Sequence, residues 1–231
     1  MLLGGWGGHI GSEIVDPIRE YSCQFKPEPK SMTMGSKISA TTLMSCDVKN
    51  EFHCMIYDLN NLHDPEKTSF KVKERNYATG LNVGDTLWLT GGMRNDKNVD
   101  DTELVLKDRV ISGPKLPIST RKHCLVKVNE TTIALIGGYD QSTGKHLGST
   151  WFYHVNENPW KKVNGPSLQR GRSSHSCATF EHNGETYIIA MMSTSASLRS
   201  MEILNIKSNK WIYGKYLKII FSSISHIWQN I

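Results

Sequence analysis

The sequence predicts an all-β protein built from about five four-stranded antiparallel units, some of them incomplete. Three observations lead to this prediction. A strand-like run that ends in two glycines returns after 46 residues, from Gly91 to Gly137 (137 − 91 = 46). Short segments rich in Val, Ile, Thr, Tyr and Trp alternate with Gly, Pro, Asn and Asp roughly every 8–12 residues, as in all-β domains. No stretch keeps the apolar period of an amphipathic helix.

The paired glycines mark the ends of predicted strands. "TTIALIGGYD" (131–140) and "DTLWLTGGMR" (85–94) share one pattern, and "MLLGGWGG" opens the chain with the same signal. The apolar runs near residues 41–46 and 185–192 lack the glycines. Glycine at a strand end permits a positive φ and a close approach of another backbone, which is the role expected for these pairs. The positions are Gly4, Gly5, Gly91, Gly92, Gly137 and Gly138.

Other residues recur at a similar offset. Gly113-Pro114 corresponds to Gly165-Pro166, each ahead of a predicted strand pair. An arginine follows each of these segments, and a His-Cys or His-Ser-Cys sequence comes next. By this spacing Arg121 corresponds to Arg172, and Arg75 lies 46 residues before Arg121 (121 − 75 = 46). Fixed-period recurrence of this kind is the signature of a repeat architecture.

An aromatic position completes the repeat. Tyr153 stands seven residues before Trp160, and Leu204 stands seven before Trp211. An apolar run ending in Gly-Gly, then Tyr, then Trp resembles the kelch repeat over residues 1–213. The resemblance implies a kelch-type β-propeller of about five blades, with 86–90 and 132–136 as innermost-type strands and the aromatic residues filling the wedge between blades. Core positions are therefore expected for Tyr153, Trp160 and Trp211.

The segment 214–231 is predicted to be a divergent tail, since it carries no feature of the repeat. Its only β-prone stretch is "LKIIF" (217–221). A propeller closes by pairing strands from its two ends, so this stretch would pair near residues 1–5 or leave the ring open. We expect an open or poorly closed arc. A fragment, a truncated gene model and a small divergent propeller all fit this pattern.

Composition narrows the functional classes. The chain has 231 residues, 38% of them hydrophobic, and a formal net charge of +5. Basic and acidic residues are interspersed, which does not favour a nucleic-acid-binding stripe. The tail is too short and too polar for a membrane span. The oligomeric state is left open.

The five cysteines show no C-x-x-C pair and no zinc-ligand spacing, so most are expected to be buried free thiols. Cys46 and Cys54 could meet across a hairpin, but the sequence does not establish it. Asn129-Glu130-Thr131 is a glycosylation sequon in a predicted hairpin turn, relevant only if the chain enters the secretory pathway. No signal peptide is visible at the start of the sequence. The location is left between the cytoplasm and, for a truncated N-terminus, secretion.

No catalytic residue, metal ligand or cofactor is expected. His123 beside Cys124 and His175 near Cys177 recur with the repeat, whereas a nucleophilic Cys–His pair needs a single asymmetric constellation. The alternative is an enzyme or small-molecule binder that uses the axial channel, because galactose oxidase is similar to kelch propellers in its repeats. No copper-ligand set of tyrosines and histidines can be matched here.

The predicted function is a non-catalytic protein-interaction module that presents inter-strand loops to a protein partner. Arginines at equivalent repeat positions would share one rim and contact an acidic segment. The competing reading is that each arginine pairs with acidic residues of a neighbouring blade and stabilises the ring. The residues concerned are Arg75, Arg121, Arg170 and Arg172.

Overall fold

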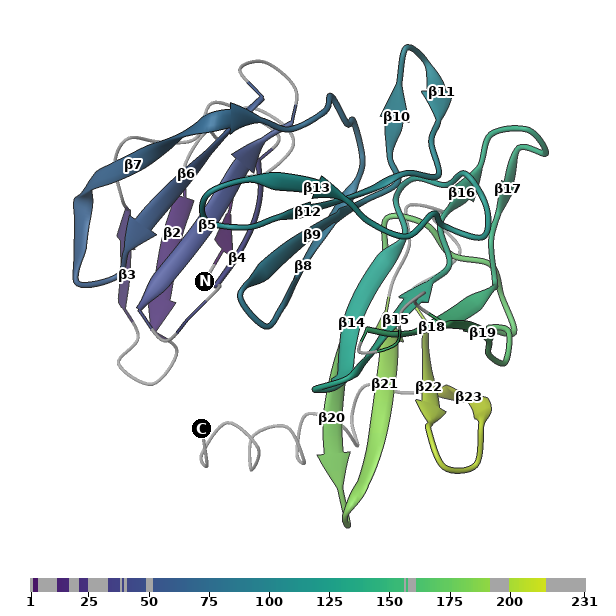
Figure 1. Ribbon diagram of the computed structural model, residues 1–231. Coiled ribbons are helices and arrows are strands. Elements are labelled where there is room, and N and C mark those ends of the chain that lie inside the picture. The colour runs from purple at the N-terminus through teal and green to yellow at the C-terminus, as the bar shows by residue number, and fades with distance from the viewer. Residues whose placement is uncertain are drawn as a thin grey trace.

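A computed structural model describes most of the chain. The described residues are 2–3, 12–16, 21–24, 33–37, 39, 41–48, 52–155, 157, 161–191 and 200–214. Every regular element within them is a β-strand, and they contain no helix (Figure 1). Gly4, Gly5, Trp160 and the segment 217–221 lie outside the described residues, so the predictions made for them stay predictions.

Four four-stranded antiparallel sheets follow one another along the chain, and we number them I to IV. In each sheet the strands lie side by side in chain order. Sheet I consists of β4 (Thr33–Lys37), β5 (Thr42–Asp47), β6 (His53–Asp58) and β7 (Asn61–Lys71), and sheet II of β8 (Thr79–Val83), β9 (Thr86–Thr90), β12 (Thr102–Val105) and β13 (Val110–Ser112). Sheet III consists of β14 (Cys124–Asn129), β15 (Thr132–Ile136), β18 (Thr150–His154) and β19 (Lys161–Asn164). Sheet IV consists of β20 (Ser176–His182), β21 (Glu185–Met191), β22 (Met201–Asn205) and β23 (Lys210–Gly214).

Two short hairpins and one smaller sheet complete the described strands. The hairpin of β10 (Met93–Arg94) and β11 (Lys97–Asn98) leaves sheet II after its paired glycines. The hairpin of β16 (Tyr139–Asp140) and β17 (Lys145–His146) leaves sheet III at the equivalent point. Both project on the same side of the molecule (Figure 1). The smaller sheet is antiparallel and consists of β1 (Leu2–Leu3), β2 (Ser12–Asp16) and β3 (Tyr21–Gln24).

Hydrophobic clusters fill the spaces between successive sheets. Leu87 and Leu89 of sheet II pack with Met44 and Ile56 of sheet I. Tyr153 joins a second cluster of residues from sheets II and III, and Trp211 joins a third from sheets III and IV. The Trp211 indole Nε1 donates to Thr150 Oγ1 at 3.2 Å and to the Pro166 carbonyl at 3.0 Å, which links sheet IV to sheet III.

The order of the sheets is consistent with a β-propeller-like fold. The first strand of each sheet contacts that of the next, since β8 contacts β4 and β14, and β14 contacts β20. The expected strands 86–90 and 132–136 match β9 and β15 in their bounds. Each is the second strand of its sheet. Contacts between adjacent sheets are made mainly by the first strands, β4, β8, β14 and β20, with smaller contributions from β9 and β21.

The paired glycines are required by the backbone. Gly91 and Gly137 have φ of 56° and 61°, in the left-handed region that favours glycine. A methyl group at Gly91 would lie 2.5 Å from the Thr120 carbonyl oxygen, and one at Gly137 would lie 2.6 Å from that of Arg172. Each glycine therefore leaves room for the loop that enters the next sheet.

Four of the cysteines form disulfides, so the expectation that most are free thiols was wrong. Cys46 and Cys54 stand directly opposite each other on β5 and β6 and are bonded, as the hairpin alternative allowed. Cys124 of β14 is bonded to Cys177 of β20, with 6.2 Å between their Cα atoms. This second pair recurs in the sequence because both residues lie near the start of a first strand, and adjacent first strands are in contact.

Candidate binding rim

Three loops lie next to one another at the starts of β8, β14 and β20, and we call them the rim loops: residues 75–78, 120–123 and 172–175. Backbone bonds join them, because Lys122 N donates to Tyr77 O at 2.9 Å and Ser174 N donates to Lys122 O at 2.8 Å. Tyr77, Lys122 and Ser174 have positive φ values of 58°, 58° and 48°, so each loop makes the same left-handed turn.

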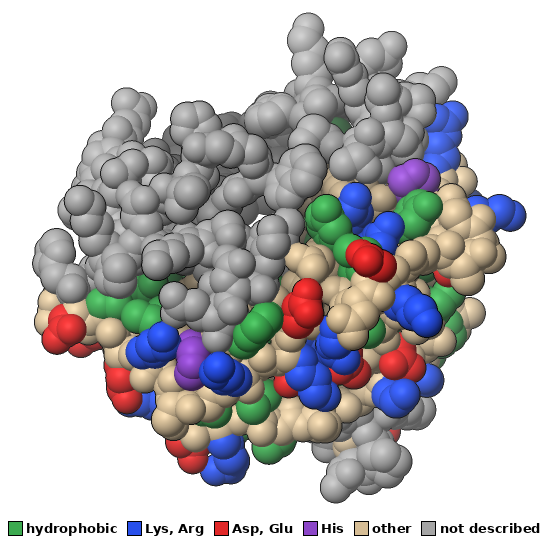
Figure 2. All heavy atoms as spheres, turned by 90° about the horizontal axis from the view of Figure 1, so that it is seen from above, with side chains coloured by type: hydrophobic (Ala, Val, Ile, Leu, Met, Phe, Trp, Pro, Cys, Tyr) green, Lys and Arg blue, Asp and Glu red, His purple; other side chains and the backbone are tan. Residues whose placement is uncertain are grey.

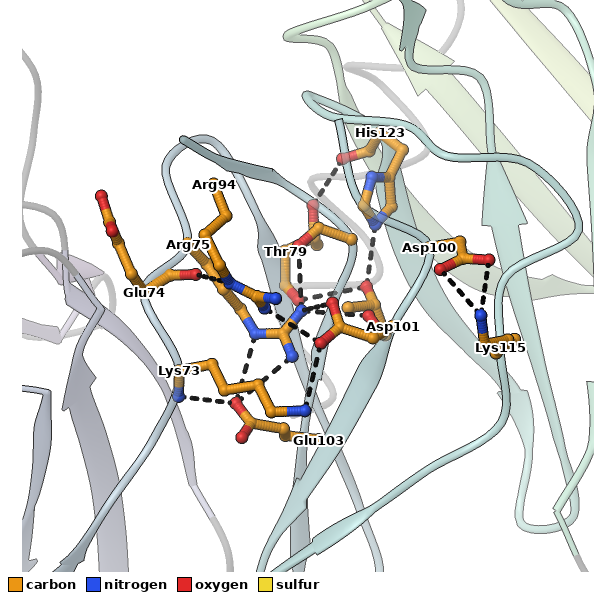
Figure 3. A network of polar contacts seen from close by, with 12 residues as sticks. Lys73, Glu74, Arg75, Thr79, Arg94, Asp100, Asp101, Glu103, Lys115 and His123 are labelled. Atoms are coloured by element: carbon orange, nitrogen blue, oxygen red, sulfur yellow. Dashed lines mark hydrogen bonds and ion pairs between the residues drawn. The ribbon is translucent and has the colours of Figure 1, made fainter. Parts of the chain in front are cut away.

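Arg75, the first residue of the first rim loop, is fully buried in a charged network (Figure 3). Its Nη1 donates to the carbonyls of Gly91 and Asp101 and to Asp101 Oδ1, at 3.0, 3.0 and 3.1 Å. Its Nε donates to Glu103 Oε2 at 3.3 Å. Burial raises the pKa of Asp101, but the hydrogen bond and charge of Arg94 and the charge of Arg75 outweigh it and hold that pKa below its ordinary value.

Arg172, at the start of the third rim loop, is buried in the same way. Its Nε and Nη2 donate to Glu202 Oε1 at 3.2 and 3.0 Å, and its Nη1 donates to the Ser200 carbonyl at 2.8 Å. Both side chains of the Arg172–Glu202 ion pair are fully buried. Glu202 also accepts the backbone N–H groups of Gln169 and Arg170. Arg75 and Arg172 are thus neutralised by carboxylates of the sheet that each one precedes, and neither can reach a partner.

The second rim loop lacks this network. Arg75 and Arg172 each stand four residues before the first strand of their sheet, and Thr120 holds that position before β14. The partner carboxylates, Glu103 and Glu202, are the second residues of β12 and β22. The second residue of the equivalent strand in sheet III, β18, is Trp151. The predicted correspondence of Arg121 with Arg75 and Arg172 is therefore wrong by one residue. A β-bulge between Lys127 and Asn129 gives β14 one residue more than β8, so a count of 46 residues from Arg75 passes the equivalent position, Thr120, by one.

Arg121 instead lies half-buried between two tyrosine rings. Its guanidinium carbon lies 5.0 Å from the Tyr139 ring centroid and 5.9 Å from that of Tyr77. Its Nη1 lies 2.7 Å from Met93 Sδ, and its Nε has no hydrogen-bond partner. Lys122 Nζ lies 4.7 Å from the Tyr77 centroid. We call these five residues the Arg121 cluster; among the described residues neither of its cations makes an ion pair.

An open pocket of about 400 Å³ adjoins the Arg121 cluster. The two are joined through Asn98, which lines the pocket and donates from its Nδ2 to the Tyr139 carbonyl at 2.8 Å. Asp140 also lines the pocket, but its carboxylate already accepts hydrogen bonds from Thr143 and Ser142, which hold its pKa below the ordinary value. The remaining lining residues are Ile118, Ser119, Gln141 and Ser142.

The described contacts of Arg170 do not include the Arg121 cluster. Its side chain is exposed and lies 5.6 Å from the ring centroid of Tyr213 on β23. The four predicted arginines therefore do not form one surface: two are buried, one is half-buried among tyrosines and one is exposed elsewhere. Asn129 is exposed as the last residue of β14, and the other two residues of its sequon form the turn to β15 that the sequence predicted.

The recurrent histidines are packing residues of the rim loops. His123 and His175 are buried against Gly91 and Gly137 of the preceding sheet. Burial and the charge of His175 lower the pKa of His123 to about 3. Burial and the charge of Arg172 lower the pKa of His175 to about 4. Cys124 and Cys177, their neighbours in sequence, are consumed in a disulfide and are not nucleophiles. In the described part of the chain no three His, Cys, Asp or Glu side chains are grouped to hold a metal ion.

Sequence reasoning missed Asp101, Glu103 and Glu202. A usable signal was present, because both glutamates interrupt apolar strands, in "TELV" and "MEILN". A charged residue in a buried strand normally requires a partner of opposite charge. The matching arginine could have been sought at the start of the same repeat.

Figure 2 looks down on the side from which the two hairpins project, and basic and acidic side chains alternate over its described part. No protein-family model matches the chain. Among the described residues, no helix has the length and apolar character needed to cross a membrane.

Proposed function

We propose that this chain is a kelch-type β-propeller module that binds an acidic segment of a protein partner through the Arg121 cluster, without catalysis. The kelch resemblance of the repeats supports the architecture, together with the succession of four-stranded sheets. The observation that carries the proposed binding site is the contrast between Arg121 and its two neighbours on the rim loops. Arg75 and Arg172 are buried against carboxylates, whereas Arg121 makes no ion pair with any described residue.

The chemistry of the Arg121 cluster suits a carboxylate. Arginine presents several N–H donors in a planar fork that fits a carboxylate in a bidentate manner. The rings of Tyr77 and Tyr139 hold the guanidinium in place and reduce the side-chain entropy lost when a partner binds. Lys122 adds a second positive charge beside it, and the adjacent pocket can accept a flanking side chain of the partner.

A charge-matched pair of variants tests the proposal. Arg121→Gln with Lys122→Gln removes two charges from the cluster. Lys107→Gln with Arg109→Gln removes two charges from the exposed turn between β12 and β13. Proteins captured by each form would be compared by quantitative mass spectrometry, and an acidic peptide from the leading partner would be titrated by fluorescence anisotropy.

We expect the cluster variant to weaken peptide binding about tenfold or more, as for truncation of a desolvated charge contact. The control variant should bind like the parent. Stability should change by less than about 2 kcal/mol, because only cation–π contacts and the contact of Arg121 with the Met93 sulfur are lost. Equal weakening by both variants, or unchanged binding by the cluster variant, would refute the site. A larger loss of stability would assign Arg121 a structural role.

A further inference from the structure

The disulfide between Cys124 and Cys177 points to an oxidising environment. It joins the first strands of sheets III and IV, which also share a hydrogen bond from Thr179 Oγ1 to the Lys127 carbonyl at 3.0 Å. The Cα separation of 6.2 Å falls in the usual range for a disulfide. With Cys46–Cys54, four of the five cysteines are paired. Structural disulfides persist in secretory compartments and are rare in the cytosol.

The same strand ends in the single Asn-x-Ser/Thr sequon of the chain. Asn129, the last residue of β14, is exposed, as are Glu130 and Thr131 in the turn between β14 and β15. Asn129 Oδ1 accepts hydrogen bonds from Thr131 N at 2.9 Å and from Thr131 Oγ1 at 3.1 Å. These two bonds occupy the amide oxygen, whereas the amide nitrogen, Nδ2, makes no hydrogen bond to a described residue.

From these two independent features we infer that Asn129 is an acceptor for N-linked glycosylation, modified while the chain matures in the compartment that oxidises Cys124 and Cys177. In the reaction, Asn129 Nδ2 forms a bond to the anomeric carbon of an oligosaccharide carried on a lipid diphosphate. The bond from that carbon to the diphosphate oxygen breaks, the diphosphate leaves with the electron pair, and Nδ2 loses one proton. The threonine hydroxyl hydrogen-bonded to Oδ1 orients the amide for this attack.

The position of Asn129 is compatible with the proposed binding rim. Cys124 begins β14 next to the Arg121 cluster, and Asn129 ends the same six-residue strand. A strand of this length spans about 20 Å, so a glycan at Asn129 would extend from the opposite end of sheet III. The glycan can therefore be present without covering the rim, and its test is independent of partner binding.

The test uses the chain purified from its own cells, with thiols blocked by N-ethylmaleimide at lysis. Digestion with peptide N-glycosidase F in heavy-oxygen water converts each glycosylated asparagine to a labelled aspartate. We expect the label at position 129 in the tryptic peptide 128–145, and a peptide pair cross-linked through Cys124 and Cys177. Unlabelled Asn129 in all copies, or Cys124 and Cys177 recovered as maleimide adducts, would overturn the inference.

Variants of the full chain directed to the secretory pathway of a cultured cell line provide the second arm. Asn129→Gln and Thr131→Ala should each remove the glycosidase-sensitive mobility shift, whereas Thr131→Ser should keep it because the hydroxyl remains. Asn164→Gln, at an exposed asparagine outside any sequon, serves as the matched control and should keep the shift. A shift that survives Thr131→Ala would also count against Asn129 as the acceptor.

Discussion

The buried Arg172–Glu202 pair gives the sharpest stability prediction. Glu202→Gln keeps the shape of the side chain but leaves the Arg172 guanidinium facing a neutral amide in a site where both side chains are fully buried. Glu202 also accepts two backbone N–H groups, and an amide presents one oxygen where the carboxylate presents two. Breaking a buried ion pair costs about 3–5 kcal/mol, and some hydrogen bonds survive in glutamine, so we expect a loss of about 3 kcal/mol.

Two matched substitutions show whether burial is the cause. Glu103→Gln should cost about 1–2 kcal/mol, because Arg75 keeps its bonds to Asp101. Glu130→Gln should cost less than about 1 kcal/mol, because the Glu130 side chain is 87% exposed in its pair with Lys127. The expected order of the free-energy losses is therefore Glu202, then Glu103, then Glu130.

Urea unfolding followed by tryptophan fluorescence measures these losses. With a denaturant slope of about 3 kcal/mol per molar, a loss of about 3 kcal/mol moves the midpoint down by about 1 M. Arg172→Met, alone and with Glu202→Gln, completes a double-mutant cycle, in which the double variant should lose less than the sum of the single variants. A loss below about 1 kcal/mol for Glu202→Gln, or strict additivity in the cycle, would refute the argument.

Two further predictions concern the rim loops. Gly137→Ala should unfold at a lower urea concentration than Gly84→Ala. Both glycines have positive φ, but of the two added methyl groups only the one at Gly137 meets another backbone. Gly137→Ala should therefore cost about 1–3 kcal/mol more than Gly84→Ala. The free energy of unfolding should also fall as pH drops from about 6.5 towards 4. The pKa values of His123 and His175 are depressed in the folded chain, so the unfolded chain binds more protons in this range. Each histidine can lower the free energy of unfolding by up to about 1.4 kcal/mol per pH unit.

Their controls are available in the same chain. Equal losses for Gly137→Ala and Gly84→Ala would mean that only the φ angle matters and that the close approach of the Arg172 carbonyl does not. For the pH dependence, His123→Gln with His175→Gln should flatten the decline between pH 6.5 and 4, whereas the exposed His182→Gln should not. An unchanged slope in the double variant would assign the decline to groups other than these two histidines.

The all-β class and the positions of the central strands could be predicted from the sequence because both depend on local properties. Alternation of apolar residues with turn residues placed β9 and β15 within their observed bounds. The paired glycines indicated positive φ, since few other residues adopt it without strain, and Gly91 and Gly137 have it. That the first strands make most of the contacts between sheets was not encoded in this way, because those contacts depend on how the sheets pack.

What only the tertiary structure decided is which residue stands at each rim position. Counting 46 residues from Arg75 led to Arg121, but the bulge adds one residue to β14, and Thr120 therefore holds the position four residues before that strand. Register follows hydrogen bonds between strands that counting cannot detect. The carboxylates that pair with Arg75 and Arg172 come 26–30 residues later in the chain. The two cysteines of the disulfide between β14 and β20 are 53 residues apart in the sequence. The sequence by itself thus determined the recurring pattern and its strands, whereas packing between sheets determined which arginines are paired with carboxylates and that Arg121, among the described residues, is not.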